Sequence, residues 1–322
     1  MKKIFIRFAR LFGYEIIDQN NFTSPTLDKD LNDDLSVINE KSIVLPLGNV
    51  KITKKINSVL IILRMNTEIE IWDQNKKRLF ERPKIDYSIR SINSLIKSIK
   101  FCQKKYPNLL IKTIIIEDHS KKENLEKIQK LVQNQNIDII SLDHEKYKPL
   151  IKKQKSNGTF SNLASLLQSF EIGKNLGEDI VFFVEDDYIH VESMLEEMLA
   201  SYERMASQIK KDIFMCPADY PYLYMSNEKT NILIGNKRHW RTINKTLCTF
   251  MTSKSLLNKY WDNFYKTCLD RHDPFEKYIN EIYEKEICIS PIKSLSLHLT
   301  NVNSSYGLAP FIDYKKLWEE NK

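Results

Sequence analysis

Three consecutive carboxylates, Glu185, Asp186 and Asp187, directly follow an apolar run in the segment DIVFFVEDDY. Like charges held this close together repel one another and raise one another's pKa. A buried strand that ends in them therefore needs a reason, and a bound cation supplies one. Mg²⁺ and Mn²⁺ prefer hard oxygen ligands, and their sites usually combine one or two carboxylates with phosphate and water. A solvated strand end is the alternative interpretation.

The segments around these carboxylates predict alternating strands and helices. Apolar runs with strand-like composition alternate with stretches of helical periodicity. Such an order implies right-handed crossovers and a largely parallel sheet covered on both faces, which is an α/β fold. The predicted strands are 59–63, 109–118, 137–143 and 180–184, and the predicted helices are 87–106, 121–133 and 160–177.

Polar side chains lie where three of these predicted strands end. Arg64 and Asn66 follow the first strand, Asp118 ends the second, and the acidic cluster 185–187 follows the last. Ligands of open parallel sheets collect beyond the carboxyl ends of the strands. The sequence therefore predicts a ligand site on one edge of the sheet.

The part of the chain after residue 190 is less regular. A helix is predicted at 191–205, followed by a basic, aromatic loop at 235–245, a helix at 273–285 and extended chain around His298. Long irregular segments are expected where a substrate pocket is shaped. We therefore divide residues 51–322 into a first half, 51–190, and a second half, 191–322, which is expected to shape the substrate pocket.

Composition limits the classes of function. The chain has 322 residues, 42% of them hydrophobic, and a net charge of +7. This modest positive charge is compatible with an anionic ligand or membrane surface and does not by itself indicate nucleic-acid binding. Its five cysteines are odd in number and widely spaced, as is typical of buried thiols in a reducing compartment. No apolar run approaches the roughly 20 residues that span a bilayer.

Residues 1–17 form a separate unit, a basic and amphipathic helix, followed by a polar linker at 18–50. Ile4, Phe8, Leu11 and Phe12 can share one helical face, and four basic residues supply positive charge. This pattern fits a peripheral anchor on an anionic inner leaflet. A helix that packs on its own domain is the alternative.

Two nucleotide-binding motifs are absent from the sequence. A P-loop requires GxxxxGK[ST], and the seven glycines include none at that spacing. No GxGxxG is present either, which argues against a dinucleotide-binding domain.

The order of the segments VLIILRMN, IKTIIIEDHS and NGTFSNLASLLQSFEIGKNLGEDIVFFVEDDYI resembles that of a GT-A glycosyltransferase of the family 2 type. The resemblance covers about residues 56–190. It implies a GT-A, Rossmann-like, mostly parallel central sheet flanked by helices, and a nucleotide-sugar donor with Mn²⁺ or Mg²⁺. In that family a strand ending in Asp before Gly or Ser precedes a strand ending in an Asp-X-Asp motif.

The resemblance implies roles for the residues on the predicted edge. Asp118 would accept a hydrogen bond from the base or ribose of the nucleotide, and Arg64 would lie beside the nucleoside. Glu185 and Asp187 occupy the acidic positions of Asp-X-Asp, with Asp187 as the direct metal ligand and Asp186 between them at the donor. The sequence departs from the family in Glu185, whose contact is to ribose, water or metal, and in having His119 where Gly is usual.

An inverting transferase also needs a general base that deprotonates the acceptor hydroxyl. In the resembling family an acidic residue near the start of a later helix has this role, and LDRHDPFEKYI offers Asp273 and Asp270. Asp273, Pro274 and Glu276 also match a capping box, with Asp273 as N-cap. We predict Asp273 as the base, with Asp270 as the alternative.

Two further groups are candidate ligands. His298 corresponds to a C-terminal histidine that some GT-A enzymes use as an additional metal ligand, and a structural histidine is the alternative. In the predicted basic loop, Arg238 is a candidate for contact with the diphosphate and Trp240 for stacking on a sugar. A solvated loop explains the same residues.

The sequence and the resemblance thus predict a cytoplasmic, peripherally membrane-bound glycosyltransferase. It would transfer a sugar from a UDP- or GDP-sugar to the hydroxyl of a saccharide or other acceptor, with inversion. A nucleotidyltransferase is the alternative within enzymes, although it would normally show a Gly-rich loop after the first strand. A catalytically silent nucleotide- or carbohydrate-binding relative is the alternative of another class. Nucleotide binding without donor hydrolysis would favour that relative.

Overall fold

The strand β4 (Ser58–Met65) lies at the centre of the protein and is buried along its whole length. In this computed structural model β4 pairs in parallel with β5 (Leu110–Glu117) on one side and β7 (Ile180–Glu185) on the other. The structure describes residues 2–14, 16, 36–44, 48–68, 78–154, 156–225, 229–300 and 308–322. Burial on both faces explains why these strands read as continuous apolar runs and not as alternating ones.

The remaining elements follow in chain order. The helices are α1 (Lys2–Leu11), α3 (Lys84–Lys105), α4 (Lys122–Val132), α5 (His144–Tyr147), α6 (Asn157–Leu176), α7 (Met194–Ile209), the 3₁₀-helix η2 (Pro221–Tyr224), α8 (Lys254–Lys259), α9 (Trp261–Leu269), α10 (Lys277–Tyr283) and α11 (Tyr314–Glu320). The other strands are β1 (Ser36–Val37), β2 (Lys41–Val44), β3 (Gly48–Val50), β6 (Ile137–Ser141), β8 (Tyr188–His190), β9 (Phe214–Met215), β10 (Ile232–Ile234), β11 (His239–Ile243), β12 (Phe250–Ser253), β13 (Cys288–Pro291) and β14 (Ser296–His298).

Nine strands form one mixed sheet in the order β10-β11-β13-β9-β12-β7-β4-β5-β6. β6, β5, β4 and β7 are mutually parallel, whereas β12 runs antiparallel to β7. The predicted α/β fold with a mostly parallel central region is confirmed. Both halves of the chain contribute strands to this sheet, so they share one framework.

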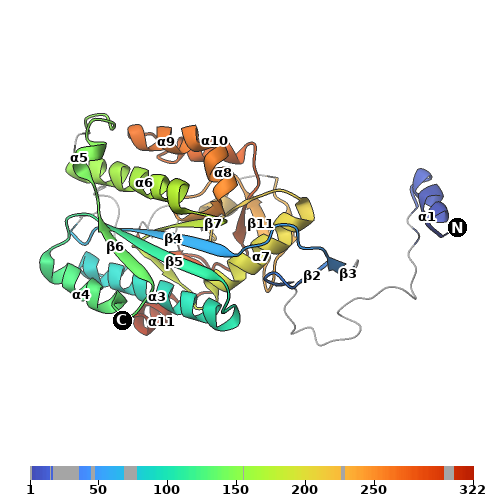
Figure 1. The fold of residues 1–322 in the computed structure, drawn as a ribbon, viewed down its shortest axis with the longest axis horizontal. Helices are drawn as coiled ribbons and strands as arrows, with labels where there is room; N and C mark the ends of the chain where they lie inside the picture. The colour runs from blue at the N-terminus through green and yellow to red at the C-terminus, as the bar shows by residue number, and fades with distance from the viewer. Residues whose placement is uncertain are drawn as a thin grey trace.

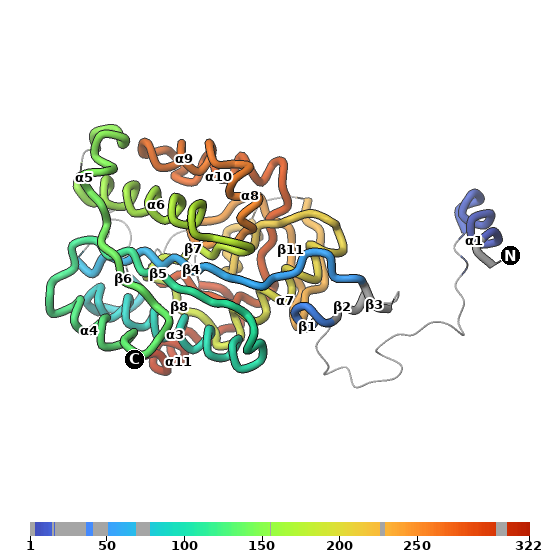
Figure 2. The backbone as a smooth tube through the Cα atoms, viewed as in Figure 1, coloured from blue at the N-terminus to red at the C-terminus, as the bar shows by residue number. Residues whose placement is uncertain are grey.

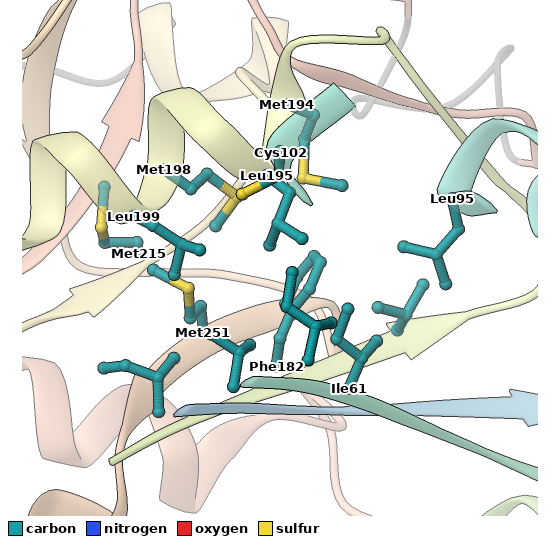
Figure 3. Close-up of a cluster of buried hydrophobic side chains, with 14 of the residues drawn as sticks. Ile61, Leu95, Cys102, Phe182, Met194, Leu195, Met198, Leu199, Met215 and Met251 are labelled. Carbon is teal, nitrogen blue, oxygen red and sulfur yellow. The ribbon is translucent and has the colours of Figure 1, made fainter. Parts of the chain in front are cut away.

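Helices cover both faces of the sheet (Figure 1). α3, α4, α7 and α11 lie on one face, and α6, α8, α9 and α10 lie on the other, as the backbone trace also shows (Figure 2). Each face has its own buried apolar cluster. The cluster beneath α7 is rich in methionine, whose flexible side chains fill the space between this helix and the sheet (Figure 3).

Helix α6 is fixed so that its first turn lies at the carboxyl edge of the strands. Its N-cap, Ser156, accepts a hydrogen bond from the backbone nitrogen of Thr159. Gly173 allows the helix to approach the sheet closely, because a Cβ at this position would lie 2.9 Å from the ring of Phe183. The distance between α6 and β7 therefore depends on the missing side chain.

Most predicted elements of the first half are confirmed within a few residues. Three predictions differ from the structure. Part of the predicted linker forms the small antiparallel sheet β1-β2-β3, while residues 17–35 lie outside the described residues. The predicted basic loop contains the strand β11, which pairs with β10 and β13. The helix predicted from residue 273 begins at Lys277.

The N-cap of α10 is therefore Glu276, not Asp273. The backbone nitrogen of Lys277 donates to the carbonyl of Pro274, which closes a turn before the helix. The capping-box prediction for Asp273 is wrong, because residues 274–277 form this turn and the helix begins only after it.

Candidate active site

The carboxyl ends of β4, β5 and β7 lie level with one another. Arg64 pairs in register with Glu185 across β4 and β7, and Met65 pairs with Glu117 across β4 and β5. The residues that follow these strands therefore meet at one edge of the sheet. The predicted convergence of Arg64, Asp118 and the acidic cluster 185–187 is confirmed.

Arg64 holds Glu185 in place. Its guanidinium donates to Glu185 Oε1 at 2.7 Å and to Asn162 Oδ1 and Ser165 Oγ on α6 at 2.8 and 3.1 Å. Burial raises the pKa of Glu185, whereas the nearby Arg64 lowers it. Arg64 is itself buried, and its contacts here are to the protein. It orients Glu185 and anchors the start of α6.

Asp186 points to the opposite side of the strand end. Its carboxylate accepts from Lys84 Nζ at 2.6 Å and from Ser88 Oγ at 2.5 Å, both on α3. Successive side chains of an extended chain point to opposite faces, so Asp186 faces α3 while Glu185 faces α6. Asp186 and Ser88 are both buried, and their hydrogen bond ties α3 to the acidic segment.

Asp187 and His298 form a buried pair beyond the end of β7. Asp187 Oδ2 accepts from Thr300 Oγ1 at 2.7 Å and lies 3.2 Å from His298 Nε2. Burial raises the pKa of Asp187, but the charge of His298 and these hydrogen bonds outweigh it, and the pKa lies well below its usual range. Burial lowers the pKa of His298, and Asp187 outweighs that effect and raises it.

The pair has features of a cation site. Asp187 Oδ1 and His298 Nδ1 are buried and have no hydrogen-bond partner among the described residues. A buried carboxylate oxygen without a partner is costly, and a divalent cation would compensate for it. The carboxylate suits Mg²⁺ or Mn²⁺, and the imidazole is a ligand more typical of transition metals. The ligand atoms of Glu185, Asp187 and His298 do not all lie close to one another; among the described residues, the three potential ligands that do are Asp118, His119 and His144.

Asp118 follows β5 and lies on the other side of β4 from Asp187. One carboxylate oxygen, Oδ2, accepts from Asn66 Nδ2 at 3.1 Å. The other, Oδ1, lies 2.8 Å from His119 Nδ1 and 2.6 Å from His144 Nε2. Burial raises the pKa of Asp118, but hydrogen bonds from its neighbours outweigh it and lower the pKa. Asp118 is thus an ionised, oriented acceptor at the predicted nucleoside position.

Neither of the two predicted bases is buried. Asp270 forms an ion pair with Lys152 at 2.9 Å and accepts from Gln154, and Asp273 is exposed. Their predicted role stays untested.

Glu276 is a third acidic residue in the same segment, and it is buried. Burial raises the pKa of the Cys248 thiol, and the charges of Glu185 and Glu276 raise it further. Glu276 is the N-cap of α10 and is enclosed by the protein, whereas Asp273 in the same segment is exposed.

The structure contradicts the predicted stacking role of Trp240. Its side chain is 0% exposed, its Nε1 faces Glu197 Oε1, and it belongs to the core beneath α7. In β11, His239 is exposed, whereas Trp240 and Arg241 are both buried. Arg238 donates to the carbonyl of Lys293, and three strands separate β11 from β7 in the sheet. Neither side chain joins the acidic edge.

Sequence reasoning missed the partners that hold the acidic segment. Lys84, Ser88 and Thr300 come from α3 and from the end of β14, and they carry no motif. Glu276 was visible only as part of a capping box. The one feature of the sequence that could have pointed to Glu276 is its position at the start of a predicted helix after a long irregular segment.

No protein-family model matches the chain, and no curated protein matches it. Solved structures show distant similarity. TarS of S. aureus in complex with UDP-GlcNAc has a TM-score of 0.39 and 13% identity, over 75% of this chain and 58% of that chain. The glycosyltransferase GlyE of Streptococcus pneumoniae TIGR4 has a TM-score of 0.37 and 11% identity, over 72% and 44%.

The inositol-1-phosphate CTP transferase from T. maritima has a TM-score of 0.39 and 8% identity, over 83% of this chain and 96% of that chain. The present chain spans about half the length of the TarS and GlyE chains. At this distance, an assignment of function rests on the geometry of the site.

Proposed function

We propose that the protein is a metal-dependent glycosyltransferase that transfers a sugar from a UDP- or GDP-sugar to a hydroxyl acceptor. The observation that carries this proposal is the buried oxygen of Asp187 beside His298, which has no hydrogen-bond partner in the part of the chain that the structure describes, at a sheet edge that also presents Asp118. A nucleotide lying along that edge would meet Asp118 at its nucleoside and Asp187 near its diphosphate. The family resemblance assigns these two positions the same roles.

Asp187 and His298 would hold Mn²⁺ or Mg²⁺, with Glu185 as a partner through water or ribose. When bound, the cation would offset the negative charge of the diphosphate leaving group. The protein groups prepare this site: Arg64 orients Glu185, and Asp186 fixes the acidic segment on α3. Transfer with inversion is the stereochemical outcome that we propose.

Thermal unfolding in the presence of nucleoside diphosphates tests this function. UDP or GDP with Mn²⁺ should raise the melting temperature, because a ligand at a hundredfold excess over its Kd stabilises the native state by about 2.7 kcal/mol. Neither Mn²⁺ nor the nucleotide alone should give the full shift, because the diphosphate would supply ligands to the cation and the cation would offset the charge of the diphosphate. Equal shifts with and without Mn²⁺ would contradict metal dependence, and no shift with any nucleotide would contradict the proposed class.

We also propose that α1 binds an anionic membrane surface. Ile4, Phe5, Phe8, Leu11 and Phe12 are between 61% and 81% exposed. The helix has no acidic residue in its first turn and ends in a basic turn, and its sequence includes Lys2, Lys3, Arg7 and Arg10. No helix among the described residues is long and apolar enough to cross a membrane. An exposed apolar face beside positive charge fits the headgroup region of anionic lipids.

Replacement of Arg7 and Arg10 by glutamine should weaken binding to vesicles that contain phosphatidylserine by about 30-fold, because each basic residue near such a surface contributes about 1 kcal/mol. Co-sedimentation with vesicles measures this change. The double variant Lys104→Gln, Lys285→Gln removes the same charge from exposed positions of the main domain and should bind like the native protein. Equal binding by the Arg7, Arg10 variant would exclude α1 as the membrane-binding element.

A further inference from the structure

Asp118, His119 and His144 form the one group in the described part of the chain in which three potential metal ligands lie close together. One ligand atom from each residue, a carboxylate oxygen or an imidazole nitrogen, lies within 4.8 Å of the other two. The two imidazoles approach the same oxygen, Asp118 Oδ1, at 2.8 and 2.6 Å, and their rings are nearly perpendicular. Two imidazoles and a carboxylate around one point form a typical set of ligands for a transition metal.

The surrounding structure fixes Asp118 and the helix that carries His144. Asn66 donates to the second oxygen of Asp118, which leaves Oδ1 directed at the imidazoles. His144 opens the short helix α5, whose N-cap Asp143 accepts from the backbone nitrogen of Lys146. Outer hydrogen bonds of this kind set the orientation of metal ligands. Asp118 and the backbone of His144 are therefore held in place by residues outside the cluster.

His119 has an unusual backbone conformation. Its φ is 53°, in the left-handed region, which costs an ordinary residue roughly 1–2 kcal/mol. This conformation directs the ring of His119 back toward Asp118 immediately before it. The ring is 75% exposed, so solvent can complete a coordination sphere on that side.

We propose that Asp118 Oδ1, His119 Nδ1 and His144 Nε2 bind a divalent transition metal of the Zn²⁺ class. Imidazole ligands favour Zn²⁺, Co²⁺ or Ni²⁺ over Mg²⁺ and Ca²⁺, which prefer oxygen. Upon binding, the protons on the two ligating nitrogens move to the other ring nitrogens or to solvent. The site is distinct from the Asp187 site and differs from it in ligand type.

Occupancy of this site has a consequence that rests on the proposed function. Asp118 Oδ1 would be coordinated and no longer available to the nucleoside. Zn²⁺ and the nucleotide would then compete. The cation site itself does not depend on the proposed function, because it requires no nucleotide.

Titration of the untagged protein with Zn²⁺ by calorimetry, and with Co²⁺ by visible absorption, tests the site without nucleotide. We expect saturable binding of one equivalent. His119→Gln and His144→Gln should each weaken it at least about 10-fold, the lower end of the effect that even outer-sphere substitutions have on metal affinity. All five cysteines are buried, which keeps thiols from competing for the metal.

His239→Gln is the matched control, because His239 is exposed on β11 and far from the site. This variant should bind Zn²⁺ like the native protein, and so should Asp187→Asn, which separates the two cation sites. The proposal is overturned if both variants of the cluster bind Zn²⁺ as tightly as the native protein, or if the native protein shows no saturable binding. Failure of the nucleotide panel would leave this result unaffected.

Discussion

Replacement of Asp187 by asparagine should reduce the affinity for UDP or GDP in the presence of Mn²⁺ by about 100-fold or more. Loss of an outer partner of a metal ligand already costs 10–100-fold in metal affinity, and Asp187 is the ligand itself. Asparagine keeps the shape of the side chain and removes its negative charge. Calorimetric titration of the nucleotide with and without Mn²⁺ measures the effect, and the difference between the two titrations should vanish in the variant.

Asp138→Asn provides the control for this experiment. Asp138 is an exposed carboxylate on β6 that forms a surface ion pair with Lys112 at 3.0 Å, and its loss should leave nucleotide binding unchanged. Circular dichroism of both variants would show that the fold is retained. Unchanged Mn²⁺-dependent affinity in a folded Asp187→Asn protein would remove Asp187 from the cation site.

Replacement of Glu276 by glutamine should lower the rate constant of transfer by about 10²–10⁴-fold, the usual contribution of a general base. We propose Glu276 for this role because it is the buried acidic residue of the segment that precedes α10, at the N-cap of that helix. Glutamine keeps the volume but cannot accept the proton of the acceptor hydroxyl. Release of the nucleoside diphosphate from nucleotide-sugars that carry the nucleotide identified by the thermal panel measures the rate.

The two bases predicted from the sequence serve as comparison variants. Asp270→Asn and Asp273→Asn remove carboxylates that are ion-paired or exposed, so each should change the rate by less than Glu276→Gln. All three variants should keep the native affinity for the nucleotide. A loss of activity confined to Asp273→Asn would return the role to that residue, and a loss of nucleotide affinity in Glu276→Gln would indicate a role in binding instead.

The elements that could be predicted are those that leave a pattern in their own stretch of sequence. β4, β5, β7 and α6 carry long apolar or periodic runs, and burial on both faces leaves that pattern in the sequence itself. The convergence of Arg64, Asp118 and the acidic cluster followed from the geometry of parallel strands. These predictions needed no knowledge of which distant segments touch.

The errors arose where a distant segment decides the structure. Trp240 lies between basic residues, and only the pairing of β11 with β10 and β13 turns it into the core. The role of Asp186 depends on Lys84 and Ser88 of α3, about a hundred residues earlier in the chain. Asp187 likewise depends on Thr300. Contacts of this kind leave no local pattern.

The position of β4 between β5 and β7 has a consequence for folding. Val59 pairs with Ile111 on one side and with Ile180 on the other, so both partners of β4 are synthesised after it. Until residues 180–185 leave the ribosome, the apolar segment SVLIILRM has an unpaired edge. Contacts between residues so far apart in the chain make folding slow, and exposed apolar edges favour aggregation meanwhile. The strand that sets the geometry of the acidic edge is thus also the segment for which the nascent chain most needs chaperone protection.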